Sequence, residues 1–253
     1  MDLPLSFYLA SVFVIVITGI SKSGFGGGLG VMAVPIMSVF VAPQFAAGVM
    51  MPILLAMDVL IVVRYRKHWQ RAIVQALLPA ALVGLCAGAL SFEYMNADHI
   101  RFVVGVLAMV FVAQFLLQST RALSPKPMGR AAVWTFGALS GFASYIAHAG
   151  GPPVKGYLLR QNLDKTDFVG TNTIYFFTLN ALKTVAYGST GTMGTESLMV
   201  SLILTPFLFL GVFVGLRLHK LVDQRIFVKV VYGFLALAAV RLLWVSVPAM
   251  FAA

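Results

Sequence analysis

The chain has 253 residues, of which 60% are hydrophobic and only 10% are charged, and its mean hydropathy is +0.94. A soluble domain carries about 25% charged residues, so this composition excludes an ordinary soluble protein and predicts an all-α polytopic membrane protein. The net charge of +10 does not indicate nucleic-acid binding, because the basic residues lie in short gaps between apolar runs and form no continuous basic face.

The first half of the chain, residues 1–120, is predicted to begin with a broken apolar hairpin at 5–42. Its legs, 5–21 and 28–42, are separated by the run Ser21-Lys22-Ser23-Gly24-Phe25-Gly26-Gly27-Gly28. Glycine costs about 1 kcal/mol relative to alanine inside a helix, so this glycine density predicts that a helix stops here. No basic residue precedes the first leg and Lys22 follows it, the reverse of a cleavable signal peptide, so we expect the leg in the mature protein. Three runs near the ~20 residues that cross the hydrocarbon core as a helix follow, at 45–63, 72–90 and 100–118.

After a proline-containing linker at 121–130, the second half, residues 131–253, repeats this order. Its hairpin at 131–160 has legs 131–147 and 152–160, separated by Gly150-Gly151-Pro152-Pro153. Gly27 to Gly150 and Phe45 to Phe168 are both 123 positions apart, so the landmarks of the two halves keep their spacing. Two related halves, each with a glycine-broken stretch near its start, are typical of secondary transporters. Full spans are predicted at 168–187, 197–216 and 226–246.

Lysine and arginine are concentrated in alternate gaps between these spans, and the gaps 43–44, 91–99 and 188–196 contain neither. Basic gaps are cytoplasmic in membrane proteins, so the linker is predicted to be cytoplasmic and both termini non-cytoplasmic. The gap 64–71 is then cytoplasmic whereas its counterpart 188–196 is external, which predicts two inverted-topology repeats with about 8–10 membrane segments. Each hairpin either crosses fully or is re-entrant, and the sequence leaves both open. The basic residues in or beside the gaps predicted to be cytoplasmic are Arg64, Arg66, Lys67, Arg71, Arg121, Lys126, Arg130, Arg160, Lys165, Arg217, Lys220, Arg225 and Lys229.

The two breaks form the predicted substrate site. Irregular backbone at membrane depth is tolerated where it is buried in protein or lines a watery cavity, and proline fits the first turn of a helix. We therefore expect helices to start at about Leu29 and Pro152, with N-termini that face the middle of the protein and suit a small oxyanion. The alternative is that the glycines only allow close helix packing. The candidate substrate-binding residues are Ser21, Lys22, Ser23, Gly26, Gly27, Gly28, Ser144, Tyr145, His148, Gly150, Gly151, Asn172 and Tyr175.

Four ionisable residues in or beside the predicted spans are functional candidates, and three of them, Asp58, His148 and Lys183, could carry charge or protons. An ammonium at Lys22 is costly in a membrane, which indicates function, although the side chain could snorkel to an interface. Asp58 could be the counter-ion of Lys22, a proton carrier or a structural partner of neighbouring donors. His148 could bind an anion or a proton, or could be a hydrogen-bonded residue at a helix end. Lys183 lies late in its span and could either take part in coupling or snorkel outward.

Other chemistry is not indicated. No set of His, Cys, Asp and Glu has the spacing of metal ligands, and no nucleophile–base pair predicts an enzyme. The single cysteine, Cys86, excludes a disulfide framework. We expect no metal and no cofactor.

The paired motifs resemble those of a known family. The run 24–28 leading to Pro35, the run 148–153 and the following Asn172-Thr173 resemble the TauE/SafE membrane transporters, and the resemblance covers essentially the whole chain. It implies a multi-pass protein of the bacterial inner membrane that exports sulfite, sulfoacetate or a related sulfur-containing anion from the cytoplasm. It does not discriminate among these substrates.

These observations together predict a secondary transporter whose repeats rock about a midplane site. The alternatives are an anion channel, a proton-coupled permease for another small anion, an intramembrane enzyme, and an accessory subunit with no transport of its own. The predicted partners are a small anionic substrate and the lipid bilayer. A homodimer is also considered, although no span has a clean small-xxx-small face.

Overall fold

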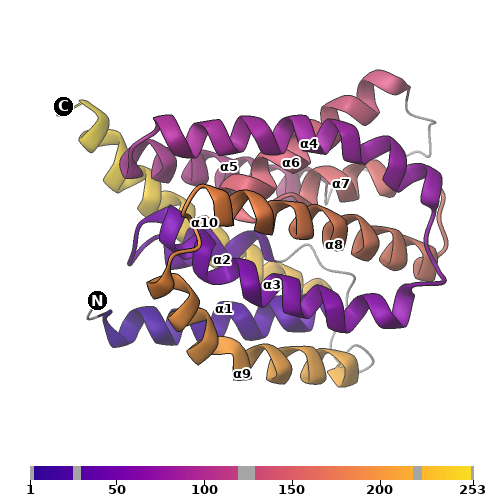
Figure 1. Cartoon of the computed structure of the whole chain (residues 1–253), viewed down its shortest axis with the longest axis horizontal. Helices are drawn as coiled ribbons and strands as arrows, with labels where there is room; N and C mark the ends of the chain where they lie inside the picture. Colours follow the sequence, from indigo (N-terminus) through magenta and orange to yellow (C-terminus); the bar gives the residue numbers. More distant parts are fainter. Residues whose placement is uncertain (1–2, 25–29, 119–128, 219–223, 252–253) are drawn as a thin grey trace.

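The computed structural model describes residues 3–24, 30–118, 129–218 and 224–251, and within these ranges all regular structure is helical (Figure 1). A long helix, a short broken helix and three long helices follow one another, and this order occurs twice. The first series is α1 (Leu5–Gly24), the 3-10 turn η1 (Gly30–Met32) with α2 (Ala33–Met37), α3 (Pro43–Tyr65), α4 (Arg71–Tyr94) and α5 (Ala97–Gln118). The second series is α6 (Arg130–Ala147), α7 (Gly151–Leu158), α8 (Lys165–Ser189), α9 (Thr195–Leu218) and α10 (Gln224–Phe251).

Six of the described helices, α1, α3, α4, α5, α9 and α10, are long and apolar enough to cross a membrane. The predicted class, an all-α polytopic membrane protein, is therefore confirmed. The long helices begin and end within a few residues of the predicted spans, because apolar runs bounded by polar gaps leave little freedom in their limits. The helix α8 is as long as the others, with 25 residues, but polar and charged side chains interrupt its apolar sequence.

The second leg of the first hairpin is shorter than the predicted 28–42. Helical structure covers 30–37, after which the backbone N–H groups of Phe40 and Val41 bond to the Met37 carbonyl and close a turn. Pro43 then opens α3 at its first helical position, where no N–H is required. At ~1.5 Å per residue, this leg and the eight-residue α7 each cover about 12 Å of a core that is ~30 Å thick. Both short helices are therefore too short to cross the hydrocarbon core as helices.

The packing of the long helices has the same form in both series. The most extensive contacts pair α4 with α6, α1 with α9, α5 with α10 and α3 with α8. If each helix is replaced by its counterpart in the other series, the pair α4 and α6 becomes the pair α9 and α1. The pairs α5 with α10 and α3 with α8 stay the same. Small residues allow both exchanged pairs to approach closely. A Cβ atom at Gly84 would lie 1.9 Å from the Ala138 carbonyl oxygen, and one at Gly19 would lie 2.8 Å from the Gly211 backbone.

The central pair, α3 and α8, runs in opposite directions, so the turns that follow these helices lie at opposite ends of the molecule (Figure 1). The turn after α3 packs on the start of α8, where a Cβ at Gly170 would lie 1.5 Å from the His68 carbonyl oxygen. The turn after α8 packs on the start of α3, where a Cβ at Gly48 would lie 2.3 Å from the Thr192 carbonyl oxygen. Each turn therefore closes onto the first part of the partner helix.

Candidate functional site

A polar cavity of about 50 Å³ lies where α1, η1, α3, the α6–α7 junction and α8 meet. One water needs ~10–15 Å³ of such space, so the cavity has room for a few waters or one small oxyanion. Charged and amide side chains at this depth are expensive unless they are paired or used. The described residues that line the cavity are Lys22, Gly30, Val31, Leu54, Asp58, Ile61, Ser144, His148, Gly151, Asn172, Thr173, Phe176 and Asn180.

Helical spacing explains how two helices present their residues to the cavity. Asn172, Phe176 and Asn180 recur every four residues on α8, which places them on one face of that helix. Lys183 lies three residues after Asn180 and continues the same face. On α3, Leu54, Asp58 and Ile61 follow the same rule. The polar wall is therefore one stripe of α8 set against one stripe of α3.

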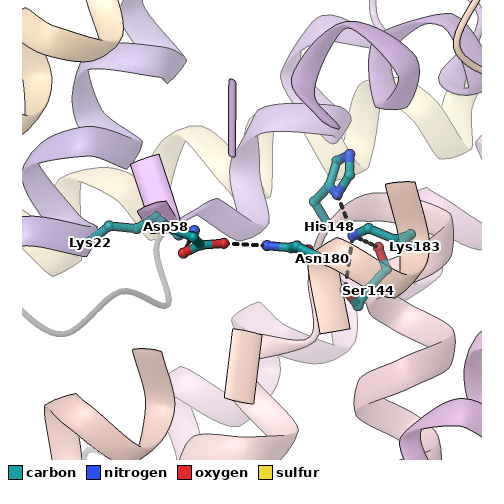
Figure 2. Close-up of polar contacts among 6 residues, drawn as sticks. All are labelled: Lys22, Asp58, Ser144, His148, Asn180 and Lys183. Atoms are coloured by element: carbon teal, nitrogen blue, oxygen red, sulfur yellow. Dashed lines mark hydrogen bonds and ion pairs between the residues drawn. The ribbon is translucent and has the colours of Figure 1, made fainter. Parts of the chain in front are cut away.

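Lys22, Asp58 and Asn180 form a chain of contacts across one side of the cavity (Figure 2). The Lys22 Nζ lies 2.5 Å from Oδ1 of Asp58, and the Nδ2 of Asn180 donates to Oδ2 at 2.6 Å. The Asp58 side chain is only 2% exposed and that of Lys22 is 14% exposed. Both carboxylate oxygens are thus occupied, which is how a buried charge is tolerated.

Lys183 forms a second cluster on the other side (Figure 2). Its side chain is fully buried, and Nζ donates to the Ser144 carbonyl at 2.9 Å and contacts the Ser144 hydroxyl at 3.0 Å and Nδ1 of His148 at 2.7 Å. These three acceptors match the three hydrogens of an ammonium group. In the part of the chain that the structure describes, no carboxylate lies within 4 Å of this nitrogen. The Ser144 O–H remains able to donate into the cavity that the residue lines.

His148 ends α6 in the left-handed conformation, with φ of 52°. Glycine or asparagine is usual at such a position, and other residues adopt it at a cost of order 1–2 kcal/mol. Two hydrogen bonds hold the ring in place: Nε2 lies 2.9 Å from the Ala47 carbonyl oxygen, and Nδ1 faces Lys183. A carbonyl only accepts, so Nε2 carries the hydrogen, and Nδ1 accepts from Lys183. The imidazole is therefore neutral in this arrangement.

Both short helices direct their starts toward the cavity, since Gly30 opens η1 and Gly151 opens α7 and both belong to the lining. The predicted start at about Pro152 is one residue late, and Leu29 lies outside the described residues. Pro152 and Pro153 have no N–H, so only Gly151 supplies a donor from the first three residues of α7. Side chains consequently carry most of the donor capacity of this site.

The structure brings some of the predicted substrate-binding residues together and leaves others elsewhere. Lys22, Ser144, His148, Gly151 and Asn172 line the cavity. Gly26, Gly27 and Gly28 lie outside the described residues, and Ser21 is buried in α1 without lining the cavity.

Four other predicted residues hold neighbouring segments together instead. The Ser23 hydroxyl donates to the carbonyls of Gly19 and Val212, which ties α1 to α9. The Tyr175 hydroxyl donates to Ser140, whose own hydroxyl donates to the Gly150 carbonyl. The Tyr145 ring packs edge-on against Phe92 and Tyr187.

The structure gives the contacts of two of the charged residues. Outward snorkelling of Lys183 is wrong, because the side chain is fully buried and turned toward α6. Among the alternatives for Asp58, the structure has it as the partner of both Lys22 and Asn180. Asn180 and Thr173 were not among the predicted site residues. The spacing of Asn180 from Asn172, two steps of four residues, is the signal that could have identified it.

The arrangement can bind a small anion. With both lysines protonated and Asp58 ionised, the described cluster carries a net charge of +1, and neutral donors at Ser144, Asn172 and Asn180 surround the open space. No three of the described His, Cys, Asp and Glu side chains are grouped so that they could hold a metal ion.

The family model for the sulfite exporter TauE/SafE matches residues 11–242, a range that contains every residue of the cavity lining. No curated protein and no solved structure matches the chain. The match extends over both series of helices. The chain therefore belongs to the sulfite exporter TauE/SafE family of multi-pass membrane transporters.

Proposed function

We propose that the protein is a secondary transporter of a bacterial inner membrane that exports small sulfur-containing oxyanions, such as sulfite or a simple organosulfonate. The substrate occupies the cavity between the two series of helices. The observation that carries this proposal is the set of charged side chains in and behind the cavity wall: among the described residues, Lys22 in the wall and Lys183 behind it outnumber the single carboxylate, Asp58. An anion is the ligand that balances that charge.

Direct contacts to the anion come from several donors. Lys22 has two ammonium hydrogens beyond the one that faces Asp58, and the Ser144 hydroxyl and the Asn172 and Asn180 amides line the same space. The Gly151 N–H at the start of α7 adds a backbone donor. Lys183 stands behind Ser144 and His148 and contributes its charge at longer range. Tetrahedral and pyramidal oxyanions suit such a convergent set of donors.

The transport mechanism that we propose is alternating access between two inverted repeats. Support comes from the exchange symmetry of the helix pairs and from the opposite directions of α3 and α8. In this mechanism, the turn at His68 on Gly170 and the turn at Thr192 on Gly48 are the two gates, which separate alternately. The termini lie on the non-cytoplasmic side and the linker 121–130 on the cytoplasmic side.

Export needs no coupling ion. Moving one elementary charge through 100 mV releases about 2.3 kcal/mol, and each 1.4 kcal/mol is about tenfold in an equilibrium. A monoanion therefore leaves a negative cytoplasm downhill by a factor of roughly 50.

Purified protein in proteoliposomes tests the proposal. Labelled sulfite should exchange against internal unlabelled sulfite, saturate with concentration and be inhibited by related oxyanions. Conductance in planar bilayers far above carrier turnover would instead make the protein an anion channel, and strict dependence on a pH gradient would make it a proton-coupled permease. No anion flux from correctly folded protein would refute the proposal.

A further inference from the structure

The lining of the cavity includes a carboxylate side chain. Asp58 is one of its lining residues, it is almost completely buried, and its two oxygens are held by Lys22 from α1 and by Asn180 from α8. Among the described lining residues it is the one carboxylate. An anion-binding site gains nothing in affinity from a fixed negative charge in its wall, so the position of Asp58 has to be explained by something other than attraction.

Charge balance supplies the explanation. With Asp58 ionised and both Lys22 and Lys183 protonated, the cluster carries one positive charge that a bound anion can neutralise. A bound monoanion brings the cluster to neutrality, whereas a dianion leaves a buried excess of one negative charge. Uncompensated charge in a buried site is strongly unfavourable. The charged cluster and a substrate with a single negative charge are therefore neutral together.

We propose that Asp58 sets the charge of the transported anion: it makes the cavity select monovalent sulfur oxyanions and reject divalent ones of the same shape. This inference rests on the proposed function and makes its substrate class narrower. Bisulfite and simple sulfonates satisfy the rule, whereas sulfoacetate and sulfate, which carry two charges, do not. Selection by a repulsive group is a general way to obtain specificity without loss of the wanted ligand.

The substitution Asp58→Asn removes this charge with little change in shape. The introduced amide can accept from Lys22 through its carbonyl oxygen and donate through its nitrogen to Asn180, provided that the Asn180 amide turns over to present its own oxygen. Both hydrogen bonds are then kept. The net charge of the described cluster rises from +1 to +2, which suits a dianion.

The test compares two anions that differ in charge and hardly in shape, methanesulfonate and sulfate. Both are tetrahedral at sulfur, and near pH 7 they carry one and two negative charges. Full-length protein in proteoliposomes is loaded with labelled methanesulfonate, and the concentrations of external methanesulfonate and sulfate that drive half-maximal exchange are measured. Wild type should prefer methanesulfonate, and D58N should change the ratio of the two half-saturation values in favour of sulfate by at least about tenfold, since each unit charge acts across only a few ångströms.

Two further variants separate charge from other effects. The double variant Lys22→Gln with Asp58→Asn removes the pair as a whole, so the cluster returns to +1 and the preference should return toward that of wild type. Asp98→Asn deletes the same charge from a partly exposed ion pair with Arg101, outside the cavity, and should leave the ratio unchanged. Elution as a single species in size-exclusion chromatography checks the fold of each variant.

The outcomes are distinguishable. A wild-type preference for sulfate, or the same ratio in D58N as in wild type, would overturn the role of Asp58 and leave the transporter proposal intact. A shift in D58N that persists in the double variant would assign selectivity to shape rather than charge, and would also overturn the inference. Failure of folded wild-type protein to exchange any of these anions would refute the proposed function itself.

Discussion

Replacing Lys183 with methionine should weaken anion binding more than any change at the surface. Methionine has nearly the same length and fits the apolar part of the site, but it removes the ammonium that donates to Ser144 and contacts His148. Both of these residues line the cavity. The lost charge therefore lies roughly 6 Å from a bound anion, a distance at which one unit charge contributes about 2–3 kcal/mol at an effective dielectric constant of ~20.

A loss of that size corresponds to a roughly 30- to 150-fold higher half-saturation concentration for sulfite. Counterflow of labelled sulfite in proteoliposomes measures this value, and thermal unfolding in detergent reports on the fold. The matched control is Lys229→Met, the same chemical change at an exposed position of α10, which should leave the half-saturation concentration unchanged. If K183M folds and exchanges sulfite with the wild-type half-saturation value, Lys183 contributes no charge to the site and the electrostatic reasoning fails.

Three other changes test different parts of the structure. Lys22→Ala should sharply reduce sulfite exchange, because it removes a direct donor and leaves Asp58 as an unpaired buried charge, and wild-type exchange in this variant would remove Lys22 from the site. Gly84→Val should destabilise the protein by about 1–3 kcal/mol in thermal unfolding, because the new side chain meets the Ala138 carbonyl, whereas Gly188→Ala, with open space around it, should not. In ¹⁵N-histidine NMR spectra at neutral pH, His148 should give the signals of a neutral ring with hydrogen on Nε2, and a ring with hydrogen on both nitrogens would contradict its assigned contacts.

The helices could be predicted from the sequence because their limits are set by composition. Apolar runs long enough to cross the bilayer, with polar gaps between them, define α3, α4, α5, α9 and α10 within a few residues. The break at 148–153 is also clear, since two consecutive prolines after two glycines fit the first turn of a helix far better than its interior. The length of α2 was overestimated because Ser38 is the only polar side chain in the run 28–42, and hydropathy does not detect the turn that closes onto Met37 before Pro43.

The candidate site was predictable in part, because its location depends on local breaks and its details depend on tertiary contacts. Lys22 and His148 stood next to the breaks, and both line the cavity. Tyr175 was expected to bind substrate together with Asn172, but the cavity side of α8 is marked by the four-residue spacing of Asn172, Phe176 and Asn180, and Tyr175 faces Ser140 instead. The direction of Lys183 could not be read from α8, because it is determined by the carbonyl and hydroxyl that Ser144 of α6 presents to it.

The location of a bound anion tests the proposed substrate site most directly. Selenite is a heavier analogue of sulfite, and its anomalous scattering identifies its position in crystals of the full-length protein. We expect a peak within hydrogen-bonding distance of Lys22 and Ser144, in the cavity that Asp58 and Asn180 also line. An empty cavity at a selenite concentration that saturates exchange, or a peak elsewhere in the protein, would contradict it.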